Sequence, residues 1–411
     1  MTLQQLDTQR DAAKLRRLTH NPRKAAGALV VVTSGVAIVV AVCLLAASVP
    51  FRAFAQNEKL SPQRQTAFEQ VISKFMAANK APGVSVAVVE RGRLLWSKGF
   101  GLANLEDEAP ASAQTLYRLG SVSKPLTATA AMQLWERGKL DLDAPIQKYC
   151  PAFPEKPQPI TTRELLGHLG GIRHYKSEAW DDPEIRNTKH FEHPIADGIK
   201  FFANDPLVAP PGTHFNYSTY GYTLVGCAIE GASGEKYVDE MRENVLVPAG
   251  MAATRADDRY AIVPQRAGFY AKDETGAVVN ADFLDSSYKI PGGGWLSSAE
   301  DMGRFESAIL TGKLLQRQTL ALMWTAQKPS DGAKDDYGLG WGIEEHDRVV
   351  TVGHDGGQQG TSTAFLIAPA QGEGVVVLSN MESVDASALA TDLLKIALAT
   401  EPDKQDPMIE H

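Results

Sequence analysis

Strand-like segments lie at both ends of this chain, and a long helical region separates them. Residues 84–89 and 93–100 are rich in β-branched and aromatic side chains, and they flank a turn at residues 90–92, which is typical of a β-hairpin. Further β-rich runs occur near the C-terminal end, at residues 348–353, 361–367 and 374–378. The pattern predicts one sheet assembled from both ends of the chain.

A helix is predicted next to each of these strand groups. Ser61 and Pro62 supply a capping hydroxyl and a first-turn proline, and an apolar stripe with helical spacing follows. That stripe consists of Phe68, Val71, Ile72, Phe75 and Met76. Residues 387–398 form a second amphipathic pattern, and the region between residues 121 and 285 is mostly helical with long loops.

The first 60 residues are expected to lie outside this domain. Residues 1–24 are polar and basic, residues 25–50 carry no charge, and residues 51–60 resemble a linker. A run of about 20 apolar residues can span a bilayer, and the basic flank favours a cytoplasmic N-terminus. The small residues 53–55 leave a cleaved signal peptide as the alternative. Either interpretation exports the folded domain, predicted at residues 61–405, to the periplasm or the extracellular space, anchored to the membrane or secreted.

The charge and the cysteines limit the function further. The formal net charge is −8, although the first 55 residues are net basic, so the remainder is strongly acidic. An acidic domain without basic runs is a poor nucleic-acid binder, and we expect none as a partner. Cys150 and Cys227 could pair in an oxidising compartment, but they lack a CxxC context and a domain of this size needs no disulfide framework, so we expect them to be unpaired.

The chemically most informative motif is Ser121-Val-Ser-Lys124. Residues at i and i+3 of a helix share one face, so the lysine amine would lie beside the serine hydroxyl. Two further Ser-x-x-Lys matches exist, at residues 233–236 and 286–289. The first lies in a glycine-containing turn, and the second runs into Pro291 and three glycines, which we expect cannot continue a helix. Only Ser121 precedes a helical pattern.

A serine nucleophile needs a base and orienting groups, and Tyr217 and His354 are the candidates. Each also has an ordinary structural interpretation, as a half-buried tyrosine and a hydrogen-bonded loop histidine. His168 and His174 are expected to hold loop backbone in place. His190 and His193 have a spacing that suits a metal, but no third ligand is evident, so we expect neither a metal nor a cofactor.

These motifs resemble those of the serine β-lactamase and penicillin-binding-protein superfamily. The resemblance covers about residues 62–400 and is closest to the class C-like branch, of peptidase S12 type, which includes LACTB-like proteins. Supporting stretches lie at residues 161–172, 292–302 and 337–342. The resemblance implies a β-lactamase/transpeptidase-like α/β (α+β) fold. In this fold an antiparallel sheet is flanked by the terminal helices, with an α-rich insertion at about residues 131–285.

The resemblance also implies a role for each site residue. Ser121 would be the acylated nucleophile, and Lys124 would share its proton and keep Tyr217 partly anionic, so that either Lys124 or Tyr217 is the base. His354 would replace the lysine of the Lys-Thr-Gly motif. The backbone amides of Ser121 and Gly357 would form the oxyanion hole. The substrate-binding positions would be Thr219, Asp355 and Gly356.

Two positions depart from the β-lactamase pattern. Thr219 replaces the asparagine of Tyr-x-Asn, and His354-Asp355-Gly356 replaces Lys-Thr-Gly, which removes a fixed positive charge because histidine is mostly neutral at pH 7. We therefore expect a serine hydrolase for small peptide, amide or ester substrates with weak or no β-lactamase activity. A catalytically inactive binding or assembly module is the alternative.

Overall fold

The computed structural model describes residues 60–176, 189–333, 335–346 and 348–399. They belong to one compact unit, Glu58–His411. The predicted basic segment and the membrane or signal segment lie outside the described residues. Within the described ranges, no helix is both long and apolar enough to cross a membrane.

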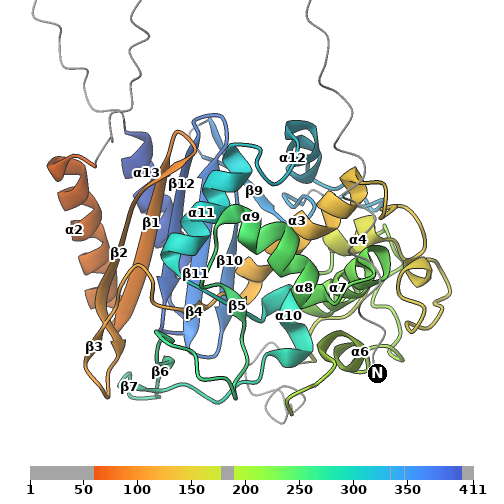
Figure 1. Ribbon diagram of the computed structural model, residues 1–411, viewed down its shortest axis with the longest axis horizontal. Coiled ribbons are helices and arrows are strands. Elements are labelled where there is room, and N and C mark those ends of the chain that lie inside the picture. Colours follow the sequence, from red (N-terminus) through yellow and green to blue (C-terminus); the bar gives the residue numbers. More distant parts are fainter. Residues whose placement is uncertain (1–59, 177–188, 334, 347, 400–411) are drawn as a thin grey trace, which may run out of the picture. The chain divides into compact units, whose positions relative to one another are not determined.

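A seven-stranded antiparallel sheet forms the centre of this unit (Figure 1). Its spatial order is β3-β2-β1-β12-β11-β10-β9. The strands are β1 (Gly83–Glu90), β2 (Arg93–Asn104), β3 (Ala109–Pro110), β9 (Gly342–His346), β10 (Val349–Gln358), β11 (Thr361–Ala368) and β12 (Glu373–Ser379). Because β1 pairs with β12 along its length, the two ends of the chain meet in one sheet, as predicted.

The structure confirms the predicted hairpin and C-terminal strands, and it differs from the prediction in one additional strand and in the length of another. Arg91 and Gly92 both adopt positive φ, which suits the tight turn between β1 and β2. The sequence pattern missed β9, and it ended β10 at Gly353, whereas the strand continues to Gln358. Glycines at positions 356 and 357 lower strand propensity, but the pairing with β11 overrides it.

The terminal helices cover one face of the sheet (Figure 1). α2 (Pro62–Asn79) begins as predicted, because the Ser61 side chain accepts a hydrogen bond from the Arg64 amide. α13 (Ala386–Leu398) packs on β11, β12 and α2. Phe68 and Ile72 of α2 are fully buried in the core between these helices and the sheet.

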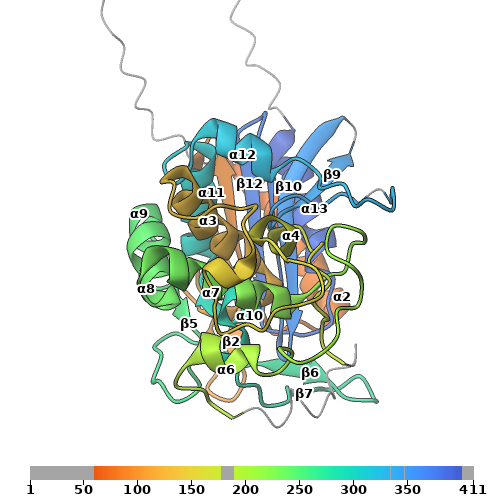
Figure 2. The same cartoon turned by 90° about the vertical axis from the view of Figure 1, so that its right-hand side faces the viewer.

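The helical region covers the other face of the sheet (Figure 2). α11 (Ala299–Leu310) lies directly on β1, β2 and β12. The remaining helices are α3 (Ser123–Glu136), α4 (Thr162–Leu166), α6 (Pro194–Ile199), α7 (Thr219–Ser233), α8 (Tyr237–Met241), α9 (Val247–Ala249), α10 (Ile290–Gly293) and α12 (Arg317–Met323). A small three-stranded sheet, β4 (Tyr117–Arg118), β8 (Trp295–Ser297) and β5 (Arg255–Ala256), joins the two halves of the chain.

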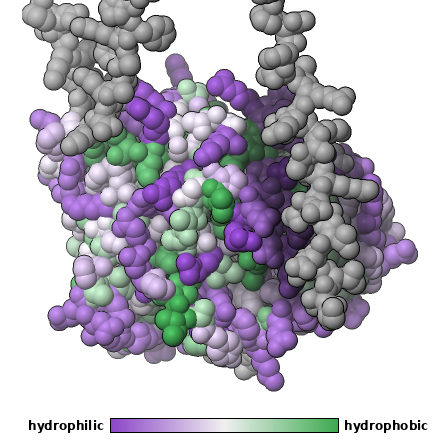
Figure 3. Space-filling model, in the orientation of Figure 1, coloured by the Kyte–Doolittle hydropathy of each residue, from purple (hydrophilic) through white to green (hydrophobic). Residues whose placement is uncertain are grey.

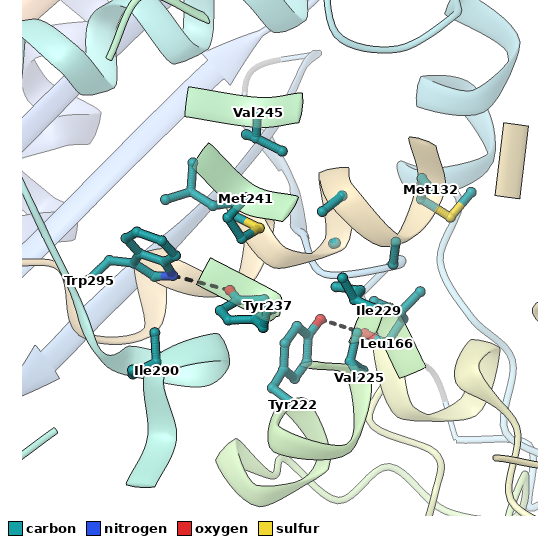
Figure 4. Close-up of a cluster of buried hydrophobic side chains, with 14 of the residues drawn as sticks. Met132, Leu166, Tyr222, Val225, Ile229, Tyr237, Met241, Val245, Ile290 and Trp295 are labelled. Atoms are coloured by element: carbon teal, nitrogen blue, oxygen red, sulfur yellow. Dashed lines mark hydrogen bonds between the residues drawn. The ribbon is translucent and has the colours of Figure 1, made fainter. Parts of the chain in front are cut away.

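Buried aromatic residues make up much of the core in the helical region (Figure 4). The Tyr222 hydroxyl donates a hydrogen bond to the Leu166 carbonyl at 2.9 Å, and the Trp295 indole donates to the Tyr237 hydroxyl at 3.1 Å. These hydrogen bonds satisfy the polar groups of the rings, so the large apolar ring surfaces are buried without leaving an unpaired donor. The face of the molecule in Figure 3 is mainly hydrophilic, with smaller hydrophobic patches.

The expectation that the two domain cysteines are unpaired is wrong. Cys150 and Cys227 form a disulfide with a Cα–Cα distance of 5.5 Å, although 77 positions separate them in the sequence. Cys227 lies on α7, and α7 packs against the segment that contains Cys150. The sequence offers no local signal for this pairing, because only the packing of α7 brings the two residues together.

Candidate active site

Ser121 lies at the junction between the sheet and the helical region. It occupies a 3₁₀ turn, Gly120–Val122, that leads directly into α3. Gly120 has a φ of 53°, and a Cβ atom there would lie 2.9 Å from the backbone nitrogen of Gly357 on β10. The glycine therefore lets the nucleophile turn approach the strand.

Lys124 is fully buried below Ser121, in the first turn of α3. Its Nζ lies 2.9 Å from Ser121 Oγ, 2.8 Å from the Gly292 carbonyl oxygen and 3.3 Å from Thr219 Oγ1. Burial lowers the pKa of Lys124 well below its ordinary value, and the positive charge of Lys289 lowers it further against the opposing effect of Asp355. The lowered pKa favours a neutral amine, which can accept a proton from Ser121.

Tyr217 completes the contacts to the nucleophile. Its hydroxyl donates a hydrogen bond to Ser121 Oγ at 2.6 Å, and the Lys124 ammonium lies 4.6 Å from its ring centroid. Burial of the hydroxyl raises the pKa of Tyr217 well above its ordinary value, and the hydrogen bond to Ser121 only partly opposes this effect. A raised pKa keeps the Tyr217 hydroxyl protonated, whereas we expected it to be partly anionic. The shift therefore favours Lys124, not Tyr217, as the base.

His168 and His174 hold the backbone that follows Tyr217, as predicted. The Ser218 amide donates to His168 Nδ1 at 3.1 Å, and the Thr219 amide donates to His174 Nδ1 at 3.3 Å. Burial lowers the pKa of both imidazoles, that of His174 to about 3, so both are neutral acceptors near pH 7.

His354 lies on β10 at the opposite wall of the site. Its Nε2 is 2.9 Å from the hydroxyl of Tyr337, a residue that the sequence analysis did not single out, and its Nδ1 is 2.6 Å from the Asp355 carbonyl oxygen. Burial lowers the pKa of His354 to about 4, and the nearby Asp355 carboxylate opposes the shift. His354 is therefore neutral at pH 7, whereas the Asp355 side chain is 76% exposed and faces the solvent.

The predicted oxyanion-hole residues also lie together. A Cβ atom on Gly356 would lie 3.0 Å from the Ser121 backbone nitrogen and 2.2 Å from the Leu119 carbonyl oxygen. The close approach places the amides of Ser121 and Gly357 on neighbouring segments beside the nucleophile. Only glycines permit this packing between β10 and the nucleophile turn.

Thr219 does not occupy the substrate-facing position that was expected. It is 3% exposed, and its hydroxyl contacts the Lys124 amine instead of the open site. The position is the first residue of α7, so its side chain turns towards α3, against which α7 packs.

A cavity of about 230 Å³ opens beside the catalytic groups. Its lining includes Tyr217, Tyr337, His354, Asp355 and Glu344. The cavity extends from Tyr217 and His354 along β9 and β10 to Ser387 and Thr391 of α13, and neither Ser121 nor Lys124 lines it. The lining contains two acidic residues, Asp355 and Glu344, and acidic side chains disfavour an anionic group on this side.

The two other Ser-x-x-Lys matches lie outside the catalytic group. Ser233 is the last residue of α7, and residues 234–236 form an exposed turn after it, in agreement with the predicted turn at the end of a helical run. The second match differs from expectation, because a 3₁₀ turn at Ser287–Lys289 continues into α10 for one turn. Pro291 lies in the first turn of α10, where no amide donor is needed. Lys289 is consequently buried near the site.

Comparisons with known proteins agree with this geometry. The β-lactamase family profile matches residues 68–399. The chain is 32% identical to the human mitochondrial serine β-lactamase-like protein LACTB over 79% of this chain and 78% of that protein. It is 29% identical to penicillin-binding protein 4* of Bacillus subtilis over 72% of this chain and 68% of that protein. The structure of the octameric penicillin-binding protein homologue from Pyrococcus abyssi superposes with a TM-score of 0.71 at 28% identity, covering 84% of this chain and 80% of that one.

Proposed function

This chain belongs to the β-lactamase family of serine hydrolases, and we propose that it cleaves peptide, amide or ester bonds through an acyl-enzyme on Ser121. One observation carries the proposal: Ser121 Oγ contacts both the Lys124 amine at 2.9 Å and the Tyr217 hydroxyl at 2.6 Å. A hydroxyl in contact with a buried amine and a phenol has both a proton acceptor and a route for returning that proton.

Acylation begins with proton transfer from Ser121 Oγ to the neutral amine of Lys124. The Oγ atom then forms a bond to the substrate carbonyl carbon, and the carbonyl electron pair moves to oxygen. The backbone amides of Ser121 and Gly357 would donate hydrogen bonds to this oxyanion. When the carbonyl re-forms, the bond to the leaving nitrogen or oxygen breaks, and that atom takes the proton from Lys124 through the Tyr217 hydroxyl.

Deacylation repeats the same steps with water. Water gives a proton to Lys124 and attacks the ester carbonyl, and the bond between the carbonyl carbon and Ser121 Oγ breaks as the proton returns to the serine. The Gly292 carbonyl and the Thr219 hydroxyl hold Nζ in place through both halves of the cycle. Fixed partners of this kind preserve the geometry that proton transfer requires.

We propose that β-lactams are poor substrates. At pH 7 the neutral His354 offers no fixed positive charge for a β-lactam carboxylate, and the exposed Asp355 carboxylate lies 3.8 Å from Nδ1 of this histidine. The repulsion between two carboxylates disfavours binding.

We further propose that the enzyme acts outside the cytoplasm. The Cys150–Cys227 disulfide supports this location, because disulfides persist in oxidising compartments. The apolar segment at residues 25–50 supports either a membrane anchor or secretion after cleavage.

The test is covalent labelling followed by turnover. A fluorophosphonate probe should label the folded chain at Ser121, and Ser121→Ala should abolish labelling. Ser233→Ala is the matched control, because it alters a serine with the same Ser-x-x-Lys spacing at the C-terminal end of α7, outside the site. Turnover of p-nitrophenyl esters, D- and L-peptides and nitrocefin then ranks the substrates. Absence of any Ser121-dependent adduct or turnover would favour the inactive binding module instead.

A further inference from the structure

Lys289 is a buried lysine that the catalytic steps leave unused. It is 3% exposed, and among the residues that the structure describes no hydrogen-bond acceptor or carboxylate contacts its ammonium. Its recorded neighbours are the rings of Tyr175 and Tyr288, each with a centroid 5.5 Å from Nζ. A buried ammonium without an acceptor is costly, so a ligand that supplies one would bind favourably.

The backbone of α10 places this lysine beside the nucleophile turn. A Cβ atom on Gly293 would lie 3.7 Å from the Lys289 side chain and 3.7 Å from the Gly120 carbonyl oxygen. The preceding residue, Gly292, accepts the hydrogen bond from Lys124. Both lysines therefore contact or closely approach the Gly292–Gly293 backbone, which itself approaches Gly120 of the nucleophile turn.

A row of rings connects Lys289 to the catalytic tyrosine. The ring of Tyr175 lies 4.1 Å from that of His174, and the ring of His174 lies 5.5 Å from that of Tyr217. Tyr175 and His174 are only half-buried. Lys289 is thus linked to Tyr217 through the half-buried rings of Tyr175 and His174.

The charged groups around Lys289 leave its charge uncompensated. The neighbouring carboxylate, Asp257, is already paired with Arg118 at 2.9 Å and with Arg266 at 3.5 Å. Lys124 and the neutral His174 also interact electrostatically with Lys289, and the titratable side chains of Tyr175 and Tyr288 face it with their rings. Burial lowers the pKa of Lys289 to about 7, Arg118 adds to the shift, and Asp257 opposes it. Near neutral pH the free site therefore holds a partly protonated amine that an anion would convert to ammonium.

We propose that Lys289 binds a carboxylate of the substrate, so that the hydrolase prefers substrates with a negative charge on one half of the scissile bond. This inference rests on the proposed function, and it names a substrate class that the catalytic residues alone do not define. The site then has two electrostatically different sides: Lys289 attracts an anionic group, and Asp355 with Glu344 repels one.

The test compares esters that differ only in this charge. One pair varies the acyl half, p-nitrophenyl hydrogen glutarate against p-nitrophenyl valerate. The other varies the leaving group, 4-carboxyphenyl acetate against its methyl ester. At pH 6.5 we expect kcat/KM to favour the charged member of one pair by about tenfold, consistent with one charge-assisted hydrogen bond. The ratio within a pair cancels effects that act on both esters.

Substitutions then assign the preference to Lys289. Lys289→Met and Lys289→Gln should abolish it, Lys289→Arg should restore it, and Lys200→Met, which removes an exposed lysine, should leave it intact. In the wild type the preference should decline as the pH rises above about 7, because the amine deprotonates, whereas Lys289→Arg should keep it. Thermal unfolding checks that each variant is folded.

The outcomes separate this inference from the proposed function. If no ester is hydrolysed in a Ser121-dependent manner, the proposed function fails. If the uncharged esters are hydrolysed but the wild type shows no charge preference in either pair, or Lys289→Met and Lys289→Gln both retain it, only the role of Lys289 is overturned.

Discussion

The rings of His168 and Tyr217 pack together with their centroids 4.4 Å apart and their planes tilted by 42°. The same imidazole accepts a hydrogen bond from the Ser218 amide, the next residue along the chain. One buried side chain thus fixes both the ring of Tyr217 and the backbone that carries it. His168 also has a φ of 59°, a conformation that asparagine tolerates better than alanine.

Replacement of His168 should therefore impair turnover more than binding. We expect His168→Ala to lower kcat about tenfold to a hundredfold with little change in KM, because Tyr217 loses its support. His168→Asn keeps an acceptor and tolerates the positive φ, so it should recover part of the loss. Steady-state kinetics with a p-nitrophenyl ester measure both variants. A rise in KM at constant kcat would contradict a positioning role.

Substitution of Lys124 tests which group is the base. Lys124→Arg retains a positive charge but cannot become neutral, so kcat/KM should fall by about 10²–10⁴-fold. In the wild type, activity should rise with pH as Lys124 deprotonates, and this acid limb should lie well below the ordinary lysine pKa, because burial lowers it. A pH profile of kcat/KM checks the position. An acid limb near the ordinary value would contradict the neutral-amine mechanism.

Loss of the disulfide should destabilise the domain. A cross-link between residues 77 positions apart restricts the unfolded chain, and the chain-entropy estimate for such a loop is about 4.5 kcal/mol. Urea unfolding of the wild type should therefore shift to lower concentrations on reduction. The double variant Cys150→Ala/Cys227→Ala should resemble the reduced protein and should not respond to reductant.

Glu306 should make the domain less stable as the pH rises. This residue of α11 is fully buried, both its carboxylate oxygens lack hydrogen-bond partners among the described residues, and burial raises its pKa well above the ordinary value. Between the unfolded pKa of about 4.3 and the raised folded pKa, the folded state holds the extra proton. The free energy of unfolding should then fall by up to about 1.4 kcal/mol per pH unit.

Two variants isolate the contribution of Glu306. Glu306→Gln should remove this part of the pH dependence, and Glu306→Leu should also raise stability at pH 7 by about 1–3 kcal/mol, because no unsatisfied polar group remains. Urea unfolding at pH 5 to 8 measures both effects. An unchanged pH slope in Glu306→Gln would contradict an uncharged buried carboxyl group.

The sequence predicted those parts of the molecule that depend on local patterns. The capped start of α2 and the turn at Arg91-Gly92 have clear local signals, and the spacing from Ser121 to Lys124 put both on the same turn. The roles of His168 and His174 in holding loop backbone were also anticipated, and hydrogen bonds to Ser218 and Thr219 confirm them.

Features that depend on packing between distant segments were not predictable in this way. The Cys150–Cys227 pair, the inward-facing Thr219 and the contact between Tyr337 and His354 depend on tertiary structure. Lys289 was dismissed with its Ser-x-x-Lys match, because Pro291 and the glycines suggested the end of a helix. The proline instead begins a single turn, which buries the lysine.

The pairing of β1 with β12 also affects how the enzyme is made. Neighbours in the centre of the sheet come from opposite ends of the polypeptide, so they cannot meet until nearly the whole chain has been synthesised. Contacts with such large sequence separation form slowly. A nascent or truncated chain that stops before residue 373 would have Ser121 and Lys124 but no finished sheet to hold β10 against them. Hydrolytic activity would thus arise only once β12 has been synthesised and has paired with β1.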